Sequence, residues 1–105
     1  MDQRMVKQLQ QMQKQMEIKM AKAQEELANE TVTSTAGGGA VTVVMNGHHE
    51  VKSVKIDPDA VDASDMEMLE DMVLTAFNDA LEKAQAMAQE KMGAITGGLN
   101  IPGMF

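Results

Sequence analysis

Residues 30–57 decide the fold, and they read ETVTSTAGGGAVTVVMNGHHEVKSVKID. Three runs rich in β-branched residues lie in this stretch, separated by Gly37-Gly38-Gly39 and by Asn46-Gly47. Both separators are typical of the turns that join strands. The stretch therefore predicts a three-stranded antiparallel meander, with a type I′ hairpin turn whose two positive-φ positions are Asn46 and Gly47.

The apolar residues of this meander indicate how its strands face the core. Alternation in the second strand places Val41, Val43 and Met45 on one face. The apolar residues of the third strand break strict alternation; they are Val51, Val54 and Ile56. This break indicates either a β-bulge or a sheet that is contacted on both faces.

A long helix is predicted on each side of the meander. Residues 3–29 contain no Gly or Pro and consist mainly of good helix formers. The second helix is expected over 64–92, starting at a capping box formed by Ser64 and Glu67 and ending before Gly93. Residues 93–105 are expected to form a flexible tail. The fold class is α+β, an α-β-β-β-α chain in a single domain over 1–105.

An apolar stripe runs along the first helix at spacings of three and four residues. Its members are Met5, Leu9, Met12, Met16, Met20, Ala23 and Leu27. A helix of 27 residues measures about 40 Å, whereas a seven-residue strand measures about 23 Å, so the sheet cannot cover the stripe. We therefore expect a second copy of the chain to bury the surplus apolar surface in a homodimer.

Charge is unevenly distributed along the 105 residues, whose net charge is −7. Residues 1–24 hold five basic and two acidic residues, a net charge of +3, and residues 25–105 carry −10. Nine acidic residues and no basic one lie between Asp57 and Glu82. A polyanion is therefore expected to approach only the N-terminal helix.

The candidate DNA-binding residues are basic and amide side chains on the face of the first helix away from the apolar stripe. They are Arg4, Lys7, Gln8, Gln11, Lys14, Gln15, Lys19 and Lys22. Lys and Arg neutralise phosphates, and Gln can hydrogen-bond to phosphate oxygens or to base edges. The alternative interpretation of the same residues is a solvated flank of a helix pair.

Other kinds of site find little support in the sequence. The chain has no Cys, Trp or Tyr, no apolar run long enough to span a membrane, and no apolar secretory segment near Met1, so a cytoplasmic protein is expected. His48 and His49 are expected on opposite faces of a strand and cannot both ligate one metal ion. No nucleophile and base are paired. We expect no catalytic, cofactor or metal site, no membrane contact and no small-molecule substrate.

Several segments resemble the YbaB/EbfC nucleoid-associated proteins of bacteria. The resemblance lies in residues 7–13 (KQLQQMQ), the Asn46-Gly47 turn, residues 54–58 (VKIDP), residues 68–80 (MLEDMVLTAFNDA) and the Gly98–Phe105 end. It implies a tweezer-like homodimer built through sheet and helix contacts. It further implies binding of double-stranded DNA by the helical arms, in the cytoplasm at the nucleoid, with a role in nucleoid organisation or gene regulation and without enzymatic activity.

One departure from the family pattern concerns the second helix. Where relatives often carry paired basic residues, this chain has Leu81-Glu82-Lys83-Ala84, so the first helix is the stronger DNA-binding candidate. An alternative function also stays open, in which the Met-rich helices clasp a partner polypeptide as an adaptable apolar surface.

Overall fold

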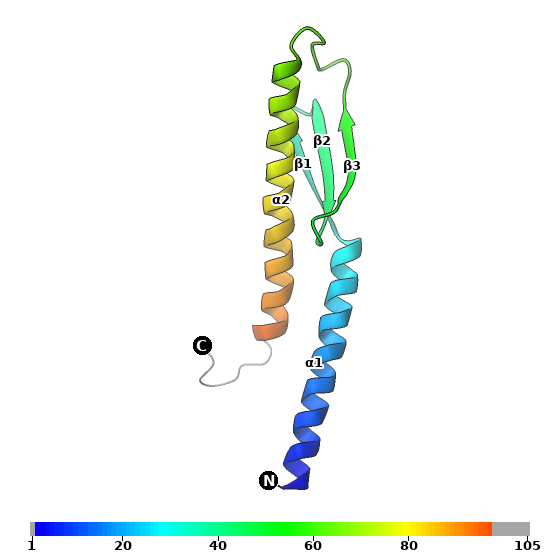
Figure 1. Ribbon diagram of the computed structural model, residues 1–105, viewed down its shortest axis with the longest axis vertical. Coiled ribbons are helices and arrows are strands. Elements are labelled where there is room, and N and C mark those ends of the chain that lie inside the picture. The colour runs from blue at the N-terminus through cyan, green and yellow to red at the C-terminus, as the bar shows by residue number, and fades with distance from the viewer. Residues whose placement is uncertain (1, 98–105) are drawn as a thin grey trace.

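The computed structural model describes residues 2–97 and has two long helices and a three-stranded sheet (Figure 1). The elements are α1 Gln3–Asn29, β1 Thr31–Ala36, β2 Val41–Asn46, β3 Val51–Ile56 and α2 Met66–Gly97. The α-β-β-β-α order predicted from the sequence is confirmed. The molecule is elongated, with principal extents of 74 × 24 × 15 Å.

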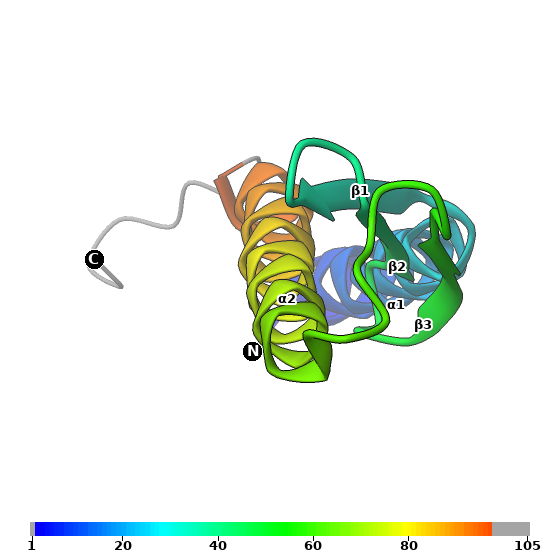
Figure 2. The same cartoon turned by 90° about the horizontal axis from the view of Figure 1, so that it is seen from above.

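The sheet is antiparallel in the order β1-β2-β3, and α2 packs across one face of β1 and β2 (Figure 2). The fully buried residues of this contact are Val41, Val43, Met45, Ala76, Ala80 and Ala84. Alanine at every fourth position of α2 lets the helix backbone lie close to the sheet, and the apolar side chains of β2 fill the space between them. The prediction that the apolar residues of β2 share one face is confirmed.

A β-bulge explains the broken alternation of β3. Val43 pairs with Val54 and Val44 with Ser53, but Met45 then pairs with Val51, so Lys52 is the extra residue. The bulge returns Val51 to the face that Val54 occupies. Because β3 is an edge strand and α2 packs mainly on β1 and β2, these apolar side chains stay exposed.

The connection between β2 and β3 differs from the type I′ turn that the sequence predicts. Neither Asn46 nor Gly47 has a positive φ; His49 has one, at 65°. The Asn46 amide donates to the carbonyl oxygen of Glu50 at 2.9 Å, and the His49 amide donates to that of Asn46 at 3.1 Å. The connection is therefore a three-residue loop with a left-handed residue at its end. The glycine at position 47 serves a different purpose, described below.

The bounds of α2 also differ from the sequence prediction. The helix begins at Met66, and Asp65 caps it by accepting a hydrogen bond from the Met68 amide at 3.1 Å, so the capping box at Ser64 was wrong. The helix continues through Gly93 to Gly97, and Ala94 and Ile95 line a cleft between α2 and α1. The predicted tail residues 98–105 lie outside the described residues. Neither described helix is long and apolar enough to cross a membrane.

Candidate nucleic-acid interface

The C-terminal turn of α1 is fastened to the loop between β2 and β3. The Gly47 amide donates to the carbonyl oxygen of Leu27 at 2.8 Å, and the Asn46 side-chain amide donates to that of Ala28 at 3.1 Å. These carbonyls lie at the end of the helix, where no partner within the helix is available. A Cβ on Gly47 would lie 2.5 Å from Leu27 Cδ2 and 2.9 Å from the Leu27 oxygen, so glycine is required for this approach.

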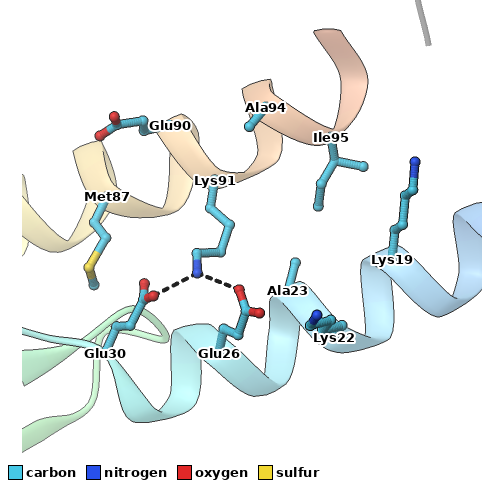
Figure 3. A pocket seen from close by; sticks show the side chains of 10 residues that line it. All are labelled: Lys19, Lys22, Ala23, Glu26, Glu30, Met87, Glu90, Lys91, Ala94 and Ile95. Carbon is cyan, nitrogen blue, oxygen red and sulfur yellow. Dashed lines mark hydrogen bonds and ion pairs between the residues drawn. The ribbon is translucent and has the colours of Figure 1, made fainter. Parts of the chain in front are cut away.

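A second fastening joins α1 to α2 near the same level (Figure 3). The Lys91 ammonium lies 2.7 Å from Glu26 Oε2 and 2.8 Å from Glu30 Oε1. The hydrogen bond from Lys91 lowers the pKa of Glu26, and the hydrogen bonds to Glu26 and Glu30 raise the pKa of Lys91. One α2 cation therefore pairs with a carboxylate of α1 and with that of the residue that caps its C-terminus, and so links the two helices.

Beyond these two fastenings, α1 projects past the end of α2 as an arm (Figure 1). The apolar stripe becomes progressively less covered along the helix. Ala23 and Leu27 are buried, whereas Met16 and Met20 are half-buried. Met5, Leu9 and Met12 are about half exposed, at 48–54%. The arm is thus anchored at its C-terminal end and uncovered over its N-terminal half.

All eight candidate DNA-binding residues are exposed on α1, but they fall into two surroundings. Six stand on the projecting arm, namely Arg4, Lys7, Gln8, Gln11, Lys14 and Gln15. Lys19 and Lys22 instead line a cleft of about 510 Å³ between α1 and α2, together with Glu26 and Glu90 (Figure 3). Within residues 2–97 the ion pairs are those of Lys83 and Lys91, so the basic side chains of the arm carry none.

The acidic loop between β3 and α2 lies away from the arm. The loop from Asp57 to Asp65 connects β3 to α2 at the opposite end of the long axis from Gln3 (Figure 1). With a long axis of 74 Å, this separation is several times the Debye length of about 8 Å at physiological salt. A polyanion on the tip of the arm is therefore screened from the acidic loop.

The two histidines have structural surroundings. His48 Nε2 lies 2.8 Å from the carbonyl oxygen of Gln24, which adds a third contact at the end of α1. His49 occupies the left-handed position of the loop. Residues 2–97 contain no group of three or more His, Cys, Asp or Glu side chains placed to hold a metal ion.

The structure also exposes an apolar surface formed by β3 and the outer side of α2. A cleft of about 450 Å³ is lined almost entirely by apolar side chains, those of Ile56, Leu69, Val73, Leu74 and Phe77, with Glu70 at its rim. Leu74 is 59% exposed and Phe77 38%. The sequence predicted surplus apolar surface from element lengths, but it did not locate this surface beside β3.

Ile18 is not among the residues predicted from the sequence, although it is 59% exposed and lies in the middle of the basic face of α1. The signal was present, because Ile18 lies four residues from both Lys14 and Lys22 and outside the apolar stripe.

Comparisons with known proteins identify the family to which the chain belongs. The profile of the YbaB/EbfC DNA-binding family matches residues 1–99. A nucleoid-associated protein of Pelotomaculum thermopropionicum is 55% identical over 102 residues, which are 97% of this chain and 93% of that protein. A nucleoid-associated protein of Chloroflexus aurantiacus is 56% identical over 99 residues, which are 94% of this chain and 97% of that protein.

Among solved structures, the uncharacterized protein HP0035 from Helicobacter pylori shares the fold. Its TM-score is 0.63 at 24% identity, over 75% of this chain and 92% of that one. The sequence profile and the curated relatives both cover nearly the whole chain, and the chain therefore belongs to the YbaB/EbfC DNA-binding family of nucleoid-associated proteins.

Proposed function

We propose that this protein is a homodimeric nucleoid-associated protein that binds double-stranded DNA with its α1 arms. The observation that carries the proposal is the placement of Arg4, Lys7 and Lys14, which are exposed, unpaired within residues 2–97 and remote from the acidic loop. Gln8, Gln11 and Gln15 lie among them and add hydrogen-bonding groups for phosphate oxygens or base edges.

The apolar surface beside β3 supports the homodimer. Side chains such as Leu74 and Phe77 form a continuous exposed patch with the edge strand, and patches of this kind mark interaction surfaces in soluble proteins. A second copy of the chain is the proposed occupant, since the patch joins a sheet edge to a helix face and both are repeated on the partner. The dimer then presents two arms and doubles the local charge of +3 to +6.

The proposed interaction is mainly electrostatic, and its strength therefore depends on salt. If the three basic side chains of each free arm contact one phosphate each, a dimer makes six contacts. The slope of log K against log[salt] is then about −5, because each contact contributes about −0.9. Lys19 and Lys22 lie beside acidic groups in the cleft and are proposed to contribute less.

A fluorescence-anisotropy titration of a labelled duplex at several salt concentrations tests the proposal. The double variant Lys7→Glu, Lys14→Glu removes four of the six contacts of the dimer. It is expected to reduce the magnitude of the slope, from about −5 to about −2, and to weaken binding strongly at low salt. Lys55→Glu is the matched control, because Lys55 is an exposed lysine on β3 that is far from the arm. No binding by the natural protein at low salt, or equal losses in the two variants, would reject the proposal.

The protein is proposed to act without catalysis, in the cytoplasm at the nucleoid, where it organises DNA or regulates genes. A second candidate function follows from Met5, Leu9 and Met12, which are exposed along the arm and suit a clasp for a partner polypeptide. Pull-downs from cell extract distinguish the two. Contacts that survive nuclease treatment and are lost in Met12→Glu favour the clasp, whereas contacts that nuclease removes favour DNA.

A further inference from the structure

Ile18 is an apolar side chain on the basic face of α1. Residues 4, 7, 11, 14, 18 and 22 follow one another at spacings of three and four, so they form one line along the helix, within a sector of about 80°. Five members of this line are Arg, Lys or Gln, and the sixth is Ile18. Lys14 and Lys22 flank it one turn away on either side.

Neither packing nor helix stability accounts for isoleucine at this position. Ile18 is 59% exposed, and it lies far around the helix from the apolar stripe that contacts the rest of the protomer. A β-branched side chain is also a poorer helix former than the Gln, Lys and Ala residues that occupy most of the exposed positions of α1. The position is one where a polar residue would give a more stable and more soluble arm.

We propose that Ile18 makes an apolar contact with double-stranded DNA, one helical turn from the phosphate contact of Lys14. This inference rests on the proposed function. The adjacent helical turn places Lys14 about 6 Å from Ile18 along the helix, and the longer lysine side chain reaches a phosphate while the shorter isoleucine faces the groove. The apolar groups of DNA in reach of such a side chain are thymine methyls and deoxyribose carbons.

This contact has an energetic signature that differs from that of the lysines. An apolar contact displaces no condensed counterions, so it adds affinity without changing the salt dependence. A phosphate contact changes both. Ile18 therefore supplies a part of the affinity that persists at salt concentrations where the contribution of the basic residues has fallen.

The test measures DNA affinity by anisotropy over a salt series for the natural protein, Ile18→Ala and Ile18→Val. We expect Ile18→Ala to weaken binding by about 5- to 30-fold with an unchanged salt slope, since each dimer loses two partly buried side chains. Ile18→Val retains most of the contact and is expected to stay within about threefold of the natural protein. Val6→Ala is the control, because Val6 lies about 120° away around the same helix and is 37% exposed.

A duplex with uracil in place of thymine distinguishes the two apolar sources. If the natural protein loses affinity for this duplex and Ile18→Ala does not, the contact is with thymine methyls. If neither discriminates and Ile18→Ala is still weaker on both duplexes, the contact is with deoxyribose.

Three outcomes would overturn the inference about Ile18. The first is equal affinity of Ile18→Ala and the natural protein at all salt concentrations. The second is a shallower salt slope in Ile18→Ala, which is expected when a phosphate contact is lost. The third is a lower light-scattering mass for Ile18→Ala, which would assign the side chain to the protein interface. A natural protein that binds no DNA would instead reject the proposed function itself.

Discussion

Substituting alanine for Gly47 should weaken the attachment of α1 to the loop between β2 and β3. The added methyl group would lie 2.5 Å from Leu27 Cδ2 and 2.9 Å from the Leu27 carbonyl oxygen, and the oxygen belongs to backbone that cannot rotate away. To relieve the overlap, the loop must withdraw from the helix end and weaken the hydrogen bonds from the Gly47 amide to Leu27, at 2.8 Å, and to Glu30, at 3.2 Å.

The magnitude follows from these contacts. Overpacking costs about 1–3 kcal/mol, and each weakened backbone hydrogen bond costs about 0.5–1.5 kcal/mol. Alanine recovers about 0.4–1 kcal/mol by restricting the unfolded chain. The expected net loss is about 2–3 kcal/mol in the free energy of unfolding. Because the chain has no Trp or Tyr, urea unfolding is best followed by far-ultraviolet circular dichroism, at one fixed protein concentration.

Gly93→Ala is the matched control within the same chain. Gly93 lies inside α2 with no atom within 4 Å of an added Cβ, so alanine there should stabilise the protein by about 0.5–1 kcal/mol. A loss below about 0.5 kcal/mol in Gly47→Ala, or a comparable loss in Gly93→Ala, would refute the argument that close approach to Leu27 requires the glycine at position 47.

Three further predictions concern the core, the ion pairs and the apolar surface. Ala80→Leu should lower the free energy of unfolding in urea by about 3 kcal/mol, because Ala80 is fully buried against the sheet. Its control, Ala86→Leu, is at an exposed position and should change this free energy by less than about 0.5 kcal/mol. Equal effects of the two substitutions would contradict the packing described. Lys91→Met should unfold at a lower temperature than the natural protein near neutral pH. The difference in unfolding temperature between the two proteins should narrow as pH falls below 4.5. Glu26 has a lowered pKa in the folded state, so the stability that its carboxylate contributes is lost as the carboxylate protonates. A difference that stays constant down to pH 3 would contradict this. Phe77→Asp should halve the mass measured by light scattering if a second copy covers the apolar surface, and an unchanged mass would place the interface elsewhere.

The parts of the fold that depend on local pattern were predictable from the sequence. The 3–29 helix follows from composition and a single apolar stripe, and its predicted bounds agree with α1. The shared face of β2 follows from alternation. The bulge in β3 was one of two alternatives, and choosing between them required the register with β2, which is a property of two strands and not of one.

The incorrect predictions have different causes. Asn46-Gly47 has the sequence of a type I′ turn, but Gly47 is adapted to the end of α1, twenty residues earlier in the chain, so a tertiary contact outweighed a local preference. Gly93 was expected to follow the helix end, but α2 continues through it to Gly97, because one glycine inside a helix costs only about 1 kcal/mol. The capping box failed for a local reason, since Asp65, one residue after Ser64, caps the helix instead.

The candidate DNA-binding residues were predictable as a face of one helix but not as a site. Spacing and charge identify all eight, because residue type and helical period are properties of the sequence alone. Their division into six on the free arm and two in the cleft depends on where α2 ends beside α1, and no local pattern reports that. Ile18 was passed over because an isolated apolar residue has no periodicity.

The anchoring of α1 at one end makes the arm a lever. The 17 residues from Gln3 to Lys19 precede the half-buried Met20 in α1, a length of about 25 Å at 1.5 Å per residue. A rotation of about 10° at the root then displaces Arg4 by about 4 Å, close to the 3.4 Å rise of one nucleotide along a DNA strand. In the proposed complex with DNA, small adjustments at Gly47 and Lys91 would therefore move the tip of the arm by about one nucleotide step.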